Sequence, residues 1–205
     1  MLDRHTPRRE AAEDLFFGQA AILWARWALI AGGALLALGR SASPPELALT
    51  ISPVLVLLLV NFYLHGRYLV EQPANERLVL LTSVLDLLMV TVMAALWRGP
   101  AGIGNPYFVL FYPIVFAFAL VFPPRLALAH TATALVLYAL FVLLGWPTVL
   151  DSARELKVLV ERLITLGAMG GLGTYYWRIL REQRRRSTAA RTRGASAAVA
   201  APAGV

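Results

Sequence analysis

The sequence predicts an all-α, polytopic integral membrane protein that folds as a bundle of six transmembrane helices. Residues of the AVILMFWYC set make up 59% of the 205 residues, and charged residues make up only 15%, whereas about a quarter of the residues of a soluble domain are charged. The apolar residues are bunched into long runs, which is typical of helices that face lipid. The six runs cover residues 16–39, 47–64, 78–97, 107–122, 126–146 and 158–177.

The first two runs form a pair joined by a short turn. Arg26 interrupts the first run between Trp24 and Trp27, and an arginine flanked by aromatic residues suits a position near a membrane interface. Residues 40–46 contain two serines and two prolines, which predict a tight turn. The second run has no charge and carries Asn61 near its end.

The third and fourth runs differ in length and are separated by a glycine-rich break. The third run has a single charged residue, Asp86, and residues 99–107 read Gly-Pro-Ala-Gly-Ile-Gly-Asn-Pro-Tyr. The fourth run would be about 24 Å long as a helix, less than the ~30 Å of a bilayer core. We therefore expect it to begin within the loop or to lie where the bilayer is locally thinned.

The fifth and sixth runs complete the predicted bundle. Residues 123–125, Pro-Pro-Arg, predict a hairpin before the fifth run, and residues 161–162 place an acid and a base in the first turns of the sixth. Gly167 and Gly171 form a GxxxG pair, with further small residues at 170–174. Small residues let helix backbones approach closely, so this face should pack tightly, either within the chain or against a second copy.

Charge divides the chain into three parts and predicts its orientation. Residues 1–15 are a polar lead-in, residues 16–177 are the membrane domain, and residues 178–205 are a basic, then low-complexity tail. We expect this tail to be a short helical extension followed by disorder. Thirteen basic residues fall on the side of the termini and five on the other, which predicts a multi-pass protein of the inner (plasma) membrane with both termini cytoplasmic.

The composition also excludes several classes of function. There is no cysteine, so disulfides and thiolate metal sites are excluded. No histidine has a second ligand at metal-binding spacing, and the common enzyme motifs for phosphate binding, acyl transfer and zinc hydrolysis are absent. The basic tail lacks a nucleic-acid-reading motif and is more simply a topology signal that attracts anionic lipid. The sequence thus predicts a protein that is not an enzyme and does not bind nucleic acid.

Asp86 and His130 are the ionisable candidates inside the membrane. A carboxylate in mid-span costs about 2.5–3.5 kcal/mol on insertion scales, so Asp86 should face the protein interior and have a partner. Arg26 could supply a counter-charge and His130 a hydrogen bond. Asp86 is then either a polar clamp between helices or a group that handles a ligand or a proton. For His130, a hydrogen-bonded histidine of the bundle is favoured over a ligand-binding role.

The glycine-rich break is the other candidate site. Gly102 leaves backbone groups accessible, and Asn105 can both donate and accept hydrogen bonds. Pro106 fixes the turn, while Tyr107 and Tyr112 could offer ring faces to a flat apolar ligand. The alternative is an ordinary turn followed by a belt of interfacial aromatic residues.

Several of these segments together are similar to the transmembrane sensor region of RegB/PrrB-type redox sensor histidine kinases and their PilS- and NtrB-like relatives. That family has a Leu-Asp-Leu span, a Gly-Gly-x-x-Asn-Pro-Phe heptapeptide, a Leu-Tyr-x-x-Pro stretch, a Pro-Pro-Arg-type hairpin and a late tyrosine. This chain has Leu85-Asp86-Leu87, Ala101-Gly102-Ile103-Gly104-Asn105-Pro106-Tyr107, Phe111-Tyr112-Pro113, Pro123-Pro124-Arg125 and Tyr138. Arg26-Trp27 and Asn61 also resemble the family's pattern. Ala101 stands where the family has its first glycine, and Tyr107 replaces a phenylalanine.

The resemblance implies a signal-transduction module of a two-component system that senses the redox state of quinone. Gly102, Asn105, Pro106 and Tyr107 would then contact the quinone, with Asp86 and Tyr112 nearby. Only 28 residues follow Trp177, without a histidine, so no catalytic kinase domain is expected in this chain. The expected partners are the lipid bilayer, a second copy, and a separate cytoplasmic kinase or response protein. Two alternatives remain, a small membrane assembly subunit and a small transporter that uses Asp86 and His130.

Overall fold

The computed structural model describes residues 6–40, 43–70, 72, 75–97 and 102–200. It contains six α-helices and three short 3₁₀ helices, and the described residues include no strand. The α-helices are α1 (Thr6–Arg40), α2 (Pro44–Leu69), α3 (Glu76–Leu96), α4 (Phe111–Val121), α5 (Pro124–Gly145) and α6 (Ala153–Ala200); the 3₁₀ helices are η1 (Gly102–Gly104), η2 (Pro106–Leu110) and η3 (Pro147–Asp151). The predicted all-α, six-helix bundle is confirmed.

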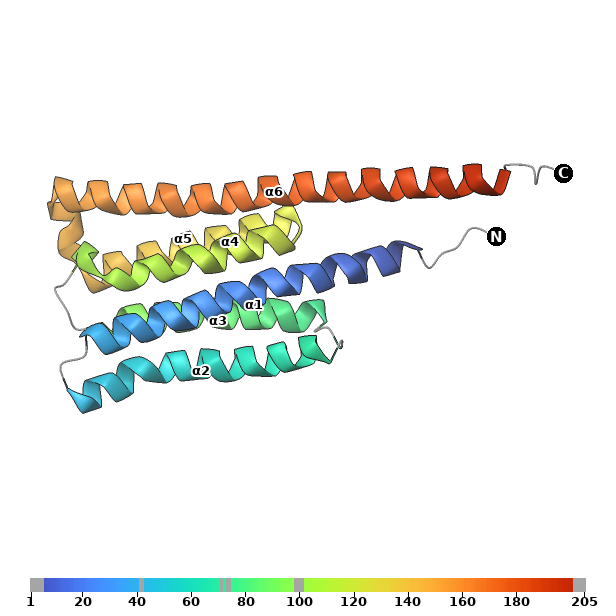
Figure 1. Cartoon of the computed structure of the whole chain (residues 1–205). Helices are drawn as coiled ribbons and strands as arrows, with labels where there is room; N and C mark the ends of the chain where they lie inside the picture. Colours follow the sequence, from blue (N-terminus) through green and yellow to red (C-terminus); the bar gives the residue numbers. More distant parts are fainter. Residues whose placement is uncertain (1–5, 41–42, 71, 73–74, 98–101, 201–205) are drawn as a thin grey trace.

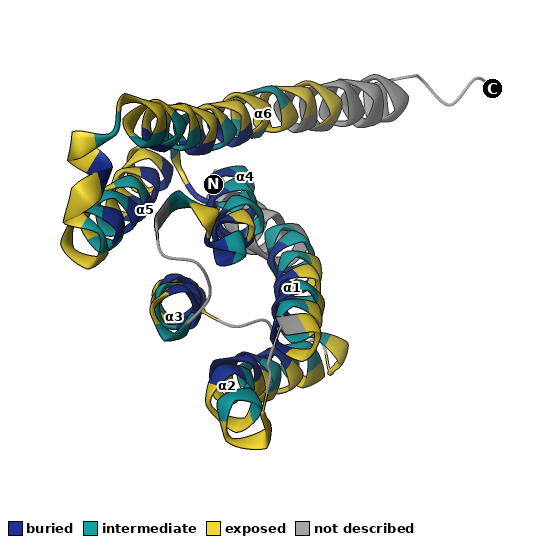
Figure 2. Cartoon of the chain, turned by 90° about the vertical axis from the view of Figure 1, so that its left-hand side faces the viewer, coloured by how far each residue is buried: buried dark blue, intermediate teal, exposed yellow. Residues whose placement is uncertain are grey.

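Successive helices run in opposite directions, so that α1 begins and α6 ends at the same end of the bundle (Figure 1). The turn from α3 through η1 and η2 into α4, here called the corner (residues 102–110), lies at the other end (Figure 1). Helix α4 is central and packs against α1, α3, α5 and α6, while α2 covers α1 and α3 (Figure 2). The corner is therefore separated from the end of α6 by the whole length of the bundle.

Among the described residues, four helical segments are long and apolar enough to cross a membrane: Gly18–Gly39, Pro44–Leu69, Glu76–Leu96 and Pro124–Gly145. Their outward faces expose large apolar side chains, including Leu35, Leu59, Phe62, Leu81 and Leu144. An apolar exterior of this extent would be costly in water but suits a hydrocarbon environment. By the same measure α6 is not among these segments, and α4 is too short. The six-span arrangement therefore stays a prediction for these two helices.

The short fourth run begins within the loop, which is one of the two alternatives that were expected. The predicted run 107–122 divides into the 3₁₀ helix η2 and the α-helix α4, and six of the eleven residues of α4 are buried. A helix that is apolar all round belongs in a protein core. Because other helices surround α4, its length need not match the bilayer, and no local thinning is required.

Proline and asparagine fix several helix starts. Pro44 and Pro124 stand at the first positions of α2 and α5, where the missing N–H is not needed. The Asn75 side chain caps α3 by accepting a hydrogen bond from the Leu78 amide at 2.9 Å. At the other end of the chain α6 continues to Ala200, beyond the short extension that we expected before disorder. Alanine and arginine, which are frequent there, are strong helix formers.

Candidate functional site

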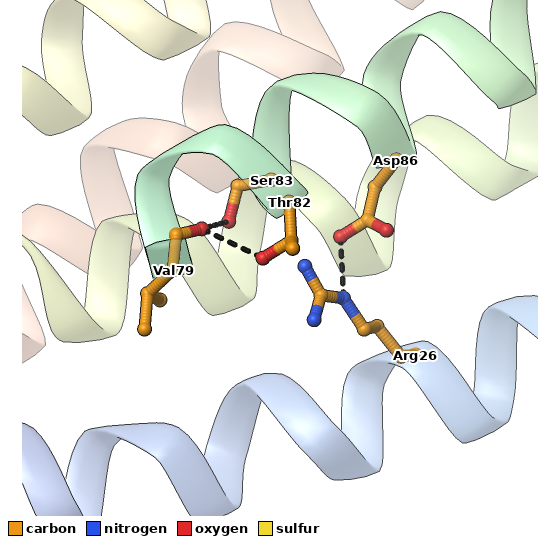
Figure 3. A network of polar contacts seen from close by, with 5 residues as sticks. All are labelled: Arg26, Val79, Thr82, Ser83 and Asp86. Atoms are coloured by element: carbon orange, nitrogen blue, oxygen red, sulfur yellow. Dashed lines mark hydrogen bonds and ion pairs between the residues drawn. The ribbon is translucent and has the colours of Figure 1, made fainter. Parts of the chain in front are cut away.

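Arg26 and Asp86 form a buried ion pair between α1 and α3 (Figure 3). The Arg26 Nε atom donates to Asp86 Oδ2 at 2.7 Å, and both residues are 3% exposed. The structure thus gives Asp86 the predicted interior position and the predicted counter-charge, and its partner is Arg26 and not His130. Two buried charges of opposite sign hold α1 and α3 at a fixed register, because sliding one helix would separate them.

This ion pair is incompletely satisfied by the protein. Among the described residues, Arg26 Nη1 and Nη2 and Asp86 Oδ1 have no hydrogen-bond partner. The nearby hydroxyls of Thr82 and Ser83 are already used, since both donate to the Val79 carbonyl, at 3.0 and 2.9 Å (Figure 3). Two cavities of about 10 Å³ each border Arg26, a size that holds one water molecule. The pair is therefore a polar centre with unpartnered atoms and with room beside it for a water molecule.

Asn105 anchors the corner to the end of α3. Its amide nitrogen donates to the Ala94 carbonyl at 2.8 Å, and its side-chain oxygen accepts from the Tyr107 amide at 3.0 Å. Asn105 is buried, and Pro106 follows as the first residue of η2. Both polar atoms of the side chain therefore bind backbone groups, so Asn105 fixes the shape of the corner.

The aromatic residues of the corner pack against one another. Tyr107 is buried, with its ring edge-on to Trp97 at a centroid distance of 5.9 Å. Tyr112 is half-buried and edge-on to Phe108 at 5.0 Å. Of the two rings that were expected to offer faces to a ligand, those of Tyr107 and Tyr112, the structure buries that of Tyr107 in the core, together with the neighbouring Phe108. Gly104 remains exposed with open space around it.

Of the other residues of the glycine-rich break, Gly102 begins η1, and Ala101 lies outside the described residues. Asp86 lies some three turns before Trp97 on α3, so the structure does not bring the ion pair and the corner into one site. Of the six predicted site residues, Asp86 therefore lies within the bundle, and the other five lie in or next to the corner.

Arg162 on α6 joins the corner to two other elements, and sequence reasoning assigned it no role. Its Nη1 atom donates to the Tyr138 hydroxyl of α5 at 2.9 Å. Its guanidinium carbon lies 4.7 Å from the centroid of the Phe108 ring in η2, a cation–π geometry. Tyr138 in turn packs on Phe108 and Phe111, at 4.7 and 5.6 Å. A charge within an apolar run does predict a partner, but nothing in the sequence identifies which one.

Two glycines of α6, Gly170 and Gly173, pack closely against other helices of the chain. A Cβ atom at Gly173 would lie 2.6 Å from the Ala119 Cβ of α4, and one at Gly170 would overlap the Thr131 side chain of α5. Gly171 has open space around it. The close approach therefore uses Gly170 and Gly173, and the GxxxG pair that the sequence pointed to, Gly167 and Gly171, does not make it.

His130 is not bonded to the ion pair but stacks on Phe118 of α4, with ring centroids 4.0 Å apart and planes 16° apart. It is 7% exposed, and among the described residues its Nε2 atom has no hydrogen-bond partner. In the same part of the chain, no group of three histidine, aspartate, glutamate or cysteine side chains could hold a metal ion.

No protein-family model matches the chain, and comparison with curated proteins and with solved structures gave no match. The resemblance to the sensor regions of histidine kinases therefore rests on the quoted sequence segments.

Proposed function

We propose that this chain is a membrane-embedded signal-sensing module of a two-component, histidine-kinase-like system, which binds a quinone at the corner. The signal would leave the membrane through α6 towards a second copy or a cytoplasmic kinase or response protein.

The observation that carries this proposal is the contact between the corner and α6. Arg162 holds Phe108 of η2 and Tyr138 of α5 together, and the helix that bears Arg162 continues beyond the other helices at the opposite end (Figure 1). A change of packing at the corner therefore acts directly on the first turns of α6, which is one continuous helix. Shifts of helices by about 1–2 Å are an established way to pass such a change on.

The ligand would act by changing how the corner packs. A quinone that inserts beside Tyr107 must separate its ring from Trp97, and the neighbouring Phe108 ring would then shift beneath Arg162. Asn105, Gly102 and Pro106 define the backbone shape against which the quinone lies. The two redox forms shift the equilibrium only if they bind the two packings with different affinity.

The chain would lie in the plasma (inner) membrane, with both of its ends on the cytoplasmic side. The start of α1 and the end of α6 lie at one end of the bundle, and the basic residues are concentrated on that side, as the positive-inside rule requires. The corner then lies near the outer surface, within reach of a membrane-soluble ligand.

The test is a titration of the full chain in lipid nanodiscs with ubiquinone-1 and with its reduced form. We expect one redox form to raise the midpoint of thermal unfolding and to change the fluorescence of Trp97. Asn105→Ala should abolish this response, because it releases the corner. Asn75→Ala, which removes the cap at the other end of α3, is the matched control and should keep the response.

Two outcomes would contradict the proposal. One is the absence of any response to either redox form. The other is an equal response in the wild-type chain and in Asn105→Ala.

A further inference from the structure

A cavity of about 310 Å³ lies between α3 and α5, with α4 as its floor, and its lining includes neither member of the ion pair and no residue of the corner. It is bounded by Leu80 and Leu88 on α3 and by Leu126 and Leu137 on α5. These residues belong largely to the first halves of their helices, so the cavity lies nearer the end of the bundle where α6 leaves. Its volume is at the lower end of the range of small-molecule sites.

The cavity opens sideways, to the outside of the bundle. Val84, Leu88 and Ala129 on its rim are exposed, and α3 and α5 lie on the same side of the molecule (Figure 2). Both helices qualify as membrane spans. A molecule that enters here therefore comes from the hydrocarbon region, so it must be soluble in lipid.

The lining of the cavity combines two stacked rings with a histidine whose Nε2 atom has no hydrogen-bond partner among the described residues. The stacked rings of Phe118 and His130 belong to its lining and favour a flat partner. The lining is otherwise apolar apart from Thr133, whose hydroxyl donates to the Ala129 carbonyl at 2.9 Å and can still accept a bond. His130 is more than nine-tenths buried, and its Nε2 atom has no partner among the described residues.

From these features we infer that the cavity binds a lipid-soluble ring compound that carries one hydroxyl group, of the alkylphenol type, with the hydroxyl hydrogen-bonded to His130. A hydroxyl suits this histidine because it can donate to the imidazole or accept from it, whichever tautomer is present. Protein atoms cover Nε2 in this structure, so the imidazole must turn about its Cβ–Cγ bond and leave the stack with Phe118 to make the bond.

The experiment uses the full chain in lipid nanodiscs and an alkylphenol that carries a photoreactive diazirine on its alkyl chain. Peptide mass spectrometry should place the adducts on α3 and α5. Unlabelled 4-hexylphenol and hexylbenzene, which differ only in the hydroxyl group, then compete with the probe. Because one hydrogen bond is at stake, 4-hexylphenol should compete at about five- to tenfold lower concentration.

Two pairs of variants test the site and the histidine separately. Ala129→Phe fills the cavity and should abolish labelling, whereas Ala132→Phe, also exposed on α5 but outside the lining, should not affect it. His130→Phe keeps the stacked ring and removes the nitrogen, so labelling should persist while the two competitors become equal. A thermal unfolding scan checks that each variant is folded, and Val84→Trp replaces Ala129→Phe if the latter is not.

Labelling that is spread over all helices, or that survives filling of the cavity, would overturn the site. Equal competition by the two compounds in the wild-type protein would show that the hydroxyl group does not contribute to binding. That result would overturn the role of His130. Neither outcome depends on the quinone response of the corner, so the two proposals can fail independently.

Discussion

Replacing Asp86 with alanine leaves the Arg26 guanidinium buried without its counter-charge. The two side chains are joined at 2.7 Å and are 3% and 5% exposed, and two guanidinium nitrogens already lack a partner among the described residues. Removing one member of a buried ion pair costs about 3–5 kcal/mol in soluble proteins. In a bilayer, Arg26 stays in an apolar environment after the helices separate, so we expect a loss near the lower end, about 3 kcal/mol.

Replacing both charged residues together should leave the stability unchanged or raise it. The double variant Arg26→Met with Asp86→Leu substitutes apolar side chains of similar size, and such exchanges are often neutral or stabilising by about 1–4 kcal/mol. The coupling energy from the double-mutant cycle should therefore be large, and the Asp86→Ala loss should largely disappear when Arg26 is also replaced.

The assay is reversible unfolding of the chain in mixed micelles, titrated with a denaturing detergent and followed by tryptophan fluorescence. Asp151→Ala, which removes an exposed carboxylate at the end of η3, is the control and should change the free energy of unfolding by less than about 0.5 kcal/mol. If Asp86→Ala costs no more than Asp151→Ala, the ion pair does not hold α1 to α3 and this reasoning is refuted.

Three further substitutions test the packing that positions the candidate sites, each measured by the same unfolding assay. Gly173→Ala should destabilise the chain by about 1–3 kcal/mol, because the added Cβ would overlap Ala119. Gly171 has open space around it, so Gly171→Ala should be neutral or stabilising. Equal effects of the two substitutions would contradict the close approach of α6 to α4. Tyr138→Phe removes the acceptor of the Arg162 hydrogen bond and should cost about 1.5–3 kcal/mol; a negligible loss would mean that the bond contributes little. Asn105→Ala leaves a carbonyl and an amide unpaired and should cost about 1–3 kcal/mol, with faster amide hydrogen exchange confined to η2; unchanged exchange there would contradict its role in shaping the corner.

The class of fold could be predicted because the bilayer imposes strong constraints on sequence. Long apolar runs set the number of helices, and proline pairs at 44–45 and 123–124 set two of their starts. The interior position of Asp86 followed from the cost of a charge in hydrocarbon, whereas the same rule left Arg26 and His130 open as its partner. These predictions depend on local composition and on a single energetic rule.

The contacts among helices could not be predicted in the same way. The sequence does not show that α4 is central, and the run 107–122 looks like a short span until the surrounding helices are in place. Arg162 and Tyr138 are separated by 24 positions in the sequence, and neither residue carries a local sign of the other. The glycines of α6 illustrate the same limit, because the motif Gly167/Gly171 is visible in the sequence whereas Gly170 and Gly173 make the contacts.

The central claim, that ligand binding at the corner moves α6, can be measured as a distance. The chain has no cysteine, so Leu69→Cys and Tyr176→Cys, both exposed, introduce two unique sites for spin labels, on α2 and α6. With ubiquinone-1, pulsed electron paramagnetic resonance in nanodiscs should show a shift of about 1–2 Å or more in the distance distribution, and Arg162→Gln should abolish it. Identical distributions with and without ubiquinone-1 in the wild-type background would contradict the account.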